Sequence, residues 1–380
     1  MNMFSFIIWN GNPDLFAFDT PMGHIALRWY GLLFAMGFLI SQQILYYIHK
    51  QEGKPEKDVE ILTIYMIVAT IIGARLGHVI FYQPEMLLND PLGVFLPFEF
   101  KPEFKFTGLK GLASHGGAFG ILFALWLYAR KKKPGQNYLQ VLDRIVILVA
   151  LTGALIRFGN YYNSEILGKP TTSPTGIIFA SQAKDAIMGD QTRSSNPVEA
   201  VTVNPNNDPA ADTIPGMHPI RFSILFKPGF PESEVRYFID GELQQRLFYC
   251  PESVKRPTGM GMHFKSILDE QSNQVLAQLD IMGISRHPAQ LYESISCVFL
   301  FLLLYYIWNK HKQNLPEGRI FGLFMIILWS LRFVYEFLKE NQVPFENSLP
   351  LNMGQILSIP LVIVGVIILV RSYQKPQPIS

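Results

Sequence analysis

The sequence is poor in charged residues and in cysteine. Charged side chains make up 16% of its 380 residues, whereas a soluble domain usually carries about 25%. Two cysteines, Cys250 and Cys297, cannot form a disulfide framework or a four-ligand zinc site. The net charge of +2 is far from the basic character that nucleic-acid binding needs, so no nucleic-acid partner is expected.

The N-terminus has no basic segment ahead of its first apolar run. Met1–Asn10 therefore does not have the pattern of a secretory signal peptide, and its apolar run is too short to cross a bilayer. Because it contains Trp9, this run is typical of a segment that lies at the membrane interface.

Long apolar runs are what the sequence does contain. A bilayer core needs about 20 mainly apolar residues per helix, and seven stretches meet this length. They are Leu27–Ile48, Val59–Tyr82, Gly111–Ala129, Leu139–Phe158, Gln290–Trp308, Arg319–Leu338 and Met353–Tyr373. The sequence therefore predicts an all-α polytopic membrane protein with about seven transmembrane helices.

Lysine and arginine gather in alternate connecting segments. They are Lys50, Lys54 and Lys57 after the first span, Arg130–Lys133 after the third, Lys310, Lys312 and Arg319 after the fifth, and Arg371 and Lys375 in the tail. Short basic loops stay in the cytoplasm. We therefore expect these four segments to be cytoplasmic and the N-terminus to lie outside.

The long segment 161–285 is then extracytoplasmic. Its first half, as around Ser194–Gly216, is rich in Asn, Pro, Ser and Thr and is predicted to be loop. Its second half has strand-like runs at Ile220–Phe226 and Val235–Ile239, and Asp240-Gly241 is a hairpin signal. We predict a small β-containing extracytoplasmic head domain at 161–285, between spans one to four with the interfacial segment (1–160) and spans five to seven (286–380).

Polar side chains of the spans gather at the ends predicted to face outward, and every span contributes. They are Arg28, Trp29, Tyr30, Arg75, His78, Ser114, His115, Arg157, Asn160, Arg286, His287, Gln290, Arg332, Glu336 and Gln355. Arg332 and Glu336 are neighbours on one helix face because they stand at positions i and i+4. Asp143 and Arg144, near the inner start of the fourth span, are the exceptions.

Two interpretations of these charges stay open. An arginine at a helix end can keep its stem in lipid and its charged head in water, so each one alone has a structural explanation. Several arginines with a histidine on one face instead indicate an anion site beside the bilayer. A phospholipid headgroup is the natural ligand, because a guanidinium binds phosphate through two parallel hydrogen bonds. We expect no metal and no cofactor.

Several local strings resemble those of the prolipoprotein diacylglyceryl transferase family. They are Trp29-Tyr-Gly, Gly73–Gly77, His115-Gly-Gly, Arg157–Gly168, Arg286–Glu293, Arg332–Phe337 and Met353–Ser358, in order along nearly the whole chain. There are departures: Ile156 replaces a usual Gly, Tyr161 a usual Phe, and Lys339 lies in a string that differs from the family's Arg-Glu-Pro-Asp. The segment Thr171–Ile281 is longer than in compact members, and no family residue is carried into it.

The resemblance implies a transferase of the bacterial inner membrane with its active site toward the extracytoplasmic side. Such enzymes transfer the diacylglyceryl group from phosphatidylglycerol to the lipobox cysteine of a preprolipoprotein. A thioether forms, and glycerol 1-phosphate leaves. The nucleophilic cysteine belongs to the substrate, which agrees with the lack of a convincing one in this chain.

The resemblance also assigns roles to residues. His115 is the candidate base, because histidine suits proton transfer near neutral pH, and an arginine-centred account of the proton transfer stays open. Arg157 and Arg332 are the phosphate partners, and Glu336 and Glu165 orient them. The remaining substrate-binding candidates are Tyr30 and Asn160, for the headgroup, and Gly168.

A polytopic transporter of an anionic or lipid substrate is the main alternative. A transporter should carry polar groups through to the cytoplasmic side, and only Asp143 and Arg144 hint at this. An intramembrane protease is less favoured, because the sequence has no H-E-x-x-H string and no pair of intramembrane aspartates. A seven-span receptor would not explain the arginines.

Overall fold

The computed structural model describes residues 6–20, 23–91, 93–94, 98–99, 105–106, 111, 113–191, 193–206, 214–255, 262–340, 346 and 348–374. Two compact units divide the chain. The first consists of Met1–Ala35, Ala154–Ser296 and Leu331–Ile356, and the second of Met36–Gly153, Cys297–Ser330 and Leu357–Ser380. Each unit is described on its own.

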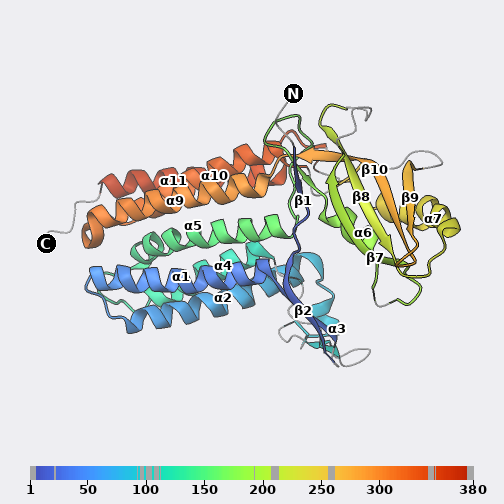
Figure 1. Cartoon of the computed structure of the whole chain (residues 1–380). Coiled ribbons are helices and arrows are strands. Elements are labelled where there is room, and N and C mark those ends of the chain that lie inside the picture. The colour runs from blue at the N-terminus through green and yellow to red at the C-terminus, as the bar shows by residue number, and fades with distance from the viewer. Residues whose placement is uncertain are drawn as a thin grey trace. The chain divides into compact units, whose positions relative to one another are not determined.

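Within the described ranges, six helices are long and apolar enough to cross a membrane. They are α1 (Trp29–Gln51), α2 (Lys57–Tyr82), α5 (Tyr138–Tyr162), α9 (Ala289–His311, with a 3-10 turn at Lys312–Asn314), α10 (Arg319–Tyr335, with a 3-10 turn at Glu336–Leu338) and α11 (Met353–Gln374) (Figure 1). Six of the seven predicted spans are thereby confirmed, with ends shifted by a few residues.

The predicted span Gly111–Ala129 is a shorter apolar helix, α4 (Ser114–Ala129). Its 16 residues extend about 24 Å at 1.5 Å per residue, less than the ~30 Å of a bilayer core. The helix starts late because Ala113 is extended, and its backbone N–H instead donates to the Ala74 carbonyl of α2 at 2.9 Å.

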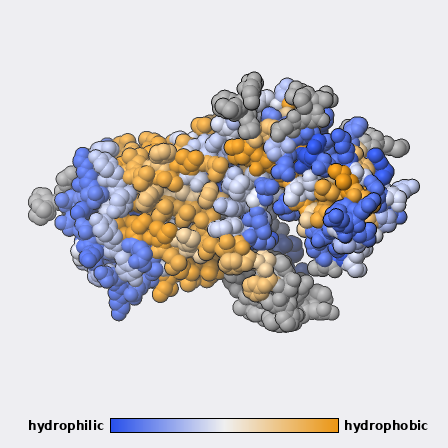
Figure 2. All heavy atoms as spheres, in the orientation of Figure 1, coloured by the Kyte–Doolittle hydropathy of each residue, from blue (hydrophilic) through white to orange (hydrophobic). Residues whose placement is uncertain are grey.

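Large apolar side chains cover the outside of the second unit. Examples are Ile64, Phe81, Phe119, Phe123, Phe299 and Ile363, all of them exposed. Figure 2 shows hydrophobic residues over the sides of these helices. Hydrophilic residues lie at the end where loops join α1 to α2 and α9 to α10. Exposed apolar surface of this extent marks contact with lipid, so the protein is a multi-pass membrane protein.

Glycines set the distance between α2 and α4. A side-chain carbon added at Gly77 would lie 2.7 Å from the Gly116 Cα, and one at Gly120 would lie 3.1 Å from the Gly73 Cα. The helices therefore touch through their backbones, as small residues four apart permit.

Asp143 and Arg144 have structural partners in the second unit. The Asp143 carboxylate accepts hydrogen bonds from the backbone N–H groups of Gly318 (2.7 Å) and Phe321 (2.8 Å), so it caps the start of α10. Arg144 Nη2 lies 2.8 Å from Glu52 Oε1. The two exceptions to the outward clustering thus fasten the ends of spans together.

A six-stranded sheet lies in the first unit. Its order is β1 (Ile7–Trp9), β6 (Ile177–Phe179), β10 (Gln274–Arg286), β8 (Met217–Phe226) and β7 (Val198–Pro205), and β9 (Phe264–Asp269) also pairs with β10. Only β1 and β6 run parallel. The alternating buried residues of β8, Ile220, Phe222, Ile224 and Phe226, join the core beneath the sheet. The predicted strand Ile220–Phe226 is confirmed within β8.

The predicted strand Val235–Ile239 and the turn at Asp240-Gly241 are wrong. This segment is helical throughout, in α7 (Glu232–Phe238), a π turn (Ile239–Leu243) and α8 (Gln244–Phe248). Its buried side chains recur at helical rather than alternating spacing. They are Val235, Phe238, Ile239, Leu243 and Leu247.

The prediction of loop for the first half of 161–285 is also wrong in part. It holds β6, β7 and helix α6 (Ser181–Met188). Arg286 ends β10 and does not begin the fifth span, because α9 starts at Ala289. The N-terminal run forms β1, paired with β6, and its place at the membrane interface stays a prediction.

Short elements complete the described chain. They are a hairpin of β2 (Asp14–Thr20) with β3 (Gly23–Arg28), a pair of β4 (Phe98–Glu99) with β5 (Lys105–Phe106), and α3 (Met86–Asn89). Because β3 extends to Arg28, the first span begins at Trp29 and not at Leu27.

We predict that Gly77→Ala destabilises the protein by about 1–3 kcal/mol, because overpacking forces two helix backbones apart. The matched control is Gly117→Ala, where the added carbon would meet Ala74 Cβ at an ordinary 3.6 Å. Thermal unfolding in detergent measures both. Equal melting temperatures for the two variants would refute the backbone contact.

Candidate active site

Arg157 lies in the last turns of α5, where the first unit brings several predicted residues together. Its Nη1 donates to Asn160 Oδ1 at 3.4 Å, and its Nε lies 2.5 Å from Glu293 Oε2 of α9. Asn160 Nδ2 in turn donates to Glu165 Oε2 at 3.2 Å. The guanidinium is thus held from two sides.

The chain turns back after α5 to bring Glu165 to this place. Ser164 and Ile166 adopt positive φ angles of 52° and 58°, which non-glycine residues rarely adopt. The Glu165 backbone N–H donates to the Asn160 carbonyl at 3.0 Å, and Gln290 donates to the Glu165 carbonyl. Glu165 therefore orients Arg157 through Asn160, and the carboxylate directly on Arg157 is Glu293.

Arg332 and Glu336 lie where α10 ends. Arg332 Nε is 3.7 Å from Glu336 Oε1. The other carboxylate oxygen, Oε2, accepts from Asn352 Nδ2 at 3.2 Å. The prediction that Arg332 and Glu336 are neighbours on one helix face is thereby confirmed.

Lys339 joins the two arginine pairs. Its Nζ pairs with Glu293, which also holds Arg157, and lies 3.4 Å from Glu336 Oε1, which also holds Arg332. We call this chain of alternating charge the arginine–lysine network. It comprises Arg157, Glu293, Lys339, Glu336 and Arg332.

Three cations share two carboxylates in this network, so it carries one excess positive charge. The arginine side chains are also its most exposed members, at 23% for Arg157 and 35% for Arg332. Glu293, Glu336 and Lys339 are 10%, 12% and 6% exposed. The network therefore presents cations outward and keeps its carboxylates behind them, an arrangement suited to an anion.

The sequence alone assigned no role to Lys339, and Glu293 appeared only as the last residue of the string Arg286–Glu293. Lys339 was part of a departure from the family pattern, although its position three residues after Glu336 was a usable signal. Glu293 could not be linked to Arg157 from the sequence, because the two lie on different helices.

Gly168 positions backbone near the network. Its N–H donates to the His287 carbonyl at 3.0 Å, and it forms an isolated β-bridge with Lys339. An added side-chain carbon would lie 2.6 Å from the His287 Cβ, so only glycine fits. Arg286 Nη1 donates to the Gly168 carbonyl at 3.1 Å and to Glu340 at 2.8 Å.

Tyr30 stands at the start of α1, beside the last turns of α5. The position of a Cβ on Gly159 lies 3.0 Å from Tyr30 Cα and from its ring carbon Cδ2. Gly159 therefore lets Tyr30 approach the turn that carries Asn160. Trp29 stacks on Tyr162 with ring centroids 5.1 Å apart, which fixes the same end of α1.

His115 belongs to the second unit. It is the second residue of α4 and is exposed. Arg75, another of the outward polar residues, donates to the backbone carbonyls of Val94 and Gly93 at 2.9 Å and holds a connecting segment. Its role is structural.

His287 is a second histidine to consider, and it lies in the first unit between β10 and α9. Burial lowers the pKa of its imidazole below the usual value. Its Nδ1 lies 3.4 Å from the Tyr292 hydroxyl. Among the described residues, no three His, Cys, Asp or Glu side chains come together as a metal site.

Comparisons with known proteins agree with the strings in the sequence. The family described as prolipoprotein diacylglyceryl transferase matches residues 16–371. The chain is similar to the phosphatidylglycerol–prolipoprotein diacylglyceryl transferase of Bacteroides fragilis, with 33% identity over 96% of this chain and 95% of the relative.

Two further relatives carry the same name. The Chloroherpeton thalassium protein is 30% identical over 99% of this chain and 98% of the relative. The Tolumonas auensis protein is 29% identical over 97% of this chain and 98% of the relative. With the family match over nearly its whole length, this chain belongs to the prolipoprotein diacylglyceryl transferase family.

Proposed function

We propose that the chain transfers the diacylglyceryl group from phosphatidylglycerol to the lipobox cysteine thiol of preprolipoproteins. Family membership and the activity for which its relatives are named support this reaction. The observation that carries it is the arginine–lysine network, whose two most exposed members are the arginines. A phosphodiester beside a membrane is the anion that such a pair fits.

The arginines have a defined task in this reaction. The thiol sulfur bonds to the terminal glyceryl carbon, and the bond between that carbon and a phosphate oxygen breaks. The thiol proton goes to a base, and the electron pair of the broken bond goes to the leaving glycerol 1-phosphate. Charge grows on the phosphate as it leaves, and the fixed guanidinium groups of Arg157 and Arg332 stabilise it. Glu336 and Glu293 hold them in place.

Asn160, Glu165 and Tyr30 complete the proposed binding site. Asn160 and Glu165 are linked at 3.2 Å and offer an amide and a carboxylate for the hydroxyls of the glycerol headgroup. Tyr30 lies at the start of a span, where tyrosine commonly meets the interface. Gly168 supports the site through the backbone contact that its missing side chain permits.

His115 is the proposed base for the acceptor thiol. Its exposure on α4 leaves the imidazole open to a substrate. The open alternatives are an arginine-centred proton transfer and His287, whose imidazole pKa is lowered by burial.

The proposed topology has seven spans, with α4 as the third. The basic loops face the cytoplasm, and the head domain at 161–285 is extracytoplasmic, between the segments 1–160 and 286–380. The active site then opens outward in the bacterial inner membrane. Basic residues in alternate loops support this orientation.

Transport is the less favoured function. Its only support was a pair of polar residues at the inner ends of spans. Asp143 caps α10, and Arg144 pairs with Glu52, so both have structural tasks. Uptake of an anionic substrate by proteoliposomes, without lipid chemistry, would favour it.

We predict that Arg157→Ala lowers transferase activity by about 10²–10³-fold, the usual cost of removing one donor to a developing anion. The assay is the shift of a prolipoprotein band with purified enzyme and phosphatidylglycerol. Arg193→Ala, which removes a 75% exposed head-domain arginine, is the matched control and keeps full activity. Full activity in Arg157→Ala would contradict the phosphate role.

Lys339 gives a second prediction. Lys339→Met leaves Glu293 and Glu336 without their shared cation, so the arginines lose their fixed positions. We expect kcat to fall by about tenfold or more, whereas Lys339→Arg restores most of it because a guanidinium can bridge both carboxylates. A change in KM alone, or no rescue by arginine, would show that Lys339 does not position the network.

His115 gives a third prediction, which uses pH. A thiol with a pKa of about 8.5 is mostly protonated at pH 7 and mostly ionised at pH 9. If His115 is the base, His115→Gln loses about 10²-fold or more at pH 7 and regains much of it at pH 9. His287→Gln is the comparison. A loss that stays equal at both pH values, or a recovery only in His287→Gln, would remove His115 from this role.

A further inference from the structure

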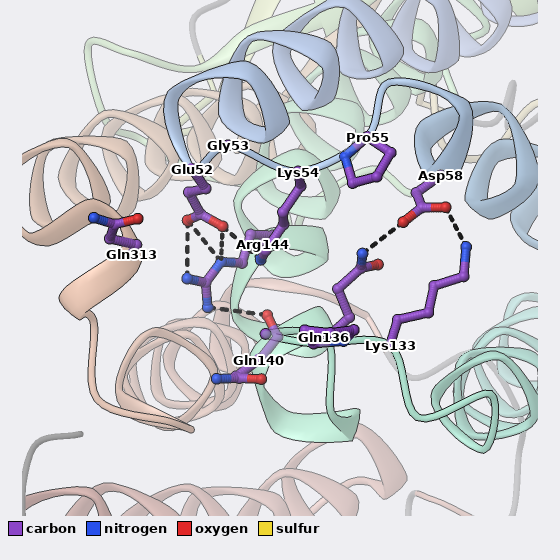
Figure 3. A pocket seen from close by; sticks show the side chains of 12 residues that line it. Glu52, Gly53, Lys54, Pro55, Asp58, Lys133, Gln136, Gln140, Arg144 and Gln313 are labelled. Carbon is purple, nitrogen blue, oxygen red and sulfur yellow. Dashed lines mark hydrogen bonds and ion pairs between the residues drawn. The ribbon is translucent and has the colours of Figure 1, made fainter. Parts of the chain in front are cut away.

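An open cavity of about 580 Å³ lies at the loop end of the second unit. Its walls come from the loops that join α1 to α2, α4 to α5 and α9 to α10, and from the first turns of α2 and α5. The charged and amide residues that line it are Glu52, Lys54, Asp58, Lys133, Gln136, Gln140, Arg144 and Gln313 (Figure 3). The cavity falls within the usual size range of small-ligand pockets, about 300–1,000 Å³.

Three cations and two carboxylates line the cavity, and a third carboxylate, Asp143, lies outside the lining at 4.0 Å from Arg144. Glu52 pairs with Arg144 at 2.8 Å and with Lys54 at 2.6 Å, and its Oε1 also accepts from the Trp308 indole at 2.7 Å. Lys133 pairs with Asp58. One carboxylate is therefore shared by two cations.

The lysines face the cavity more than their carboxylate partners do. Lys54 is 12% exposed and Glu52 is 0% exposed. Lys133 is 27% exposed and Asp58 is 7% exposed. In Figure 3 the Glu52 carboxylate points toward the Arg144 guanidinium, and Asp58 points toward Lys133 and Gln136. The cavity surface is thus cationic, with the acids set behind it.

The surroundings of Lys54 and Glu52 shift the pKa values of both side chains. Burial, together with the Arg144 guanidinium, lowers the pKa of the Lys54 ammonium despite its contact with Glu52. Burial by itself raises the pKa of Glu52, but Arg144 and Lys54 outweigh it and the pKa lies below its usual value. An added anion would therefore stabilise the charged form of Lys54.

The loops around the cavity add to its positive field. Further basic side chains stand in the same connecting segments, namely Lys50, Lys57, Arg130, Lys131, Lys132 and Lys310. Gly53 and Gly135 have φ angles of 64° and 65°, so these loops turn without a side chain that would fill the cavity. Basic pockets at the cytoplasmic ends of helices are suited to phosphate-bearing headgroups.

We propose that this cavity binds a phosphate group, through Lys54 and Lys133 at its surface with Arg144 behind them. The phosphate belongs either to an anionic phospholipid of the adjacent leaflet or to a small soluble phosphate ester. This site is separate from the proposed transferase site, since it shares no residue with the arginine–lysine network.

The test is native mass spectrometry of the full-length protein in detergent, titrated with phosphatidic acid. The double variant Lys54→Gln/Lys133→Gln keeps Glu52 bonded to Arg144 and Asp58 bonded to Gln136. We expect it to bind phosphatidic acid roughly tenfold more weakly or worse, because two lysines are lost. The matched control, Lys50→Gln/Lys57→Gln, removes the same charge from exposed positions outside the lining and should weaken binding much less, because those lysines contribute only to the surrounding field.

A second variant fills the cavity without changing its charge. Gln313→Trp should weaken binding of phosphatidic acid while thermal unfolding stays unchanged. Competition by glycerol 3-phosphate assigns the site to soluble phosphate esters, and binding that resists competition assigns it to the lipid. The proposal is overturned if the two double variants weaken binding of phosphatidic acid equally, or if Gln313→Trp binds it as wild type does. It is also overturned if Lys54→Gln/Lys133→Gln loses as much affinity for diacylglycerol, which has no phosphate, as for phosphatidic acid.

Discussion

A carboxylate shared by two cations is the interaction on which both units depend. Glu293 lies between Arg157 and Lys339 in the first unit, and Glu52 lies between Arg144 and Lys54 in the second. A buried charge is costly unless it is paired. A shared acid ties together chain segments that are distant in the sequence. Removal of any one partner therefore leaves a buried charge without its counter-charge.

The arginine–lysine network and the lining of the cavity each contain three cations and two carboxylates. In each, the carboxylates are more deeply buried than the most exposed cations. This burial order separates a binding site from a plain ion pair, because an approaching ligand meets donors first. In the arginine–lysine network the outer cations are arginines, whose planar fork fits a phosphodiester. In the cavity they are lysines, which bind as mobile point charges.

The helical part of the fold was largely predictable, because hydrophobic length alone decides where a chain can cross a bilayer. Six spans were found within a few residues of their predicted ends. The head region was harder. Val235–Ile239 is rich in β-branched and aromatic side chains, yet Leu243 and Leu247 continue its buried face at helical spacing. A window of five residues cannot separate the two periods.

The candidate site was predicted as residues and short-range pairs, and not as a network. Arg157, Asn160 and Glu165 lie within one turn and its return loop, so local spacing suffices to group them. Lys339 acts through Glu293, a partner on another helix, and such a link depends on packing that spacing does not encode. Lys339 reaches both Glu293 and Glu336, so it places a cation between two acids although the surrounding string departs from that of the family.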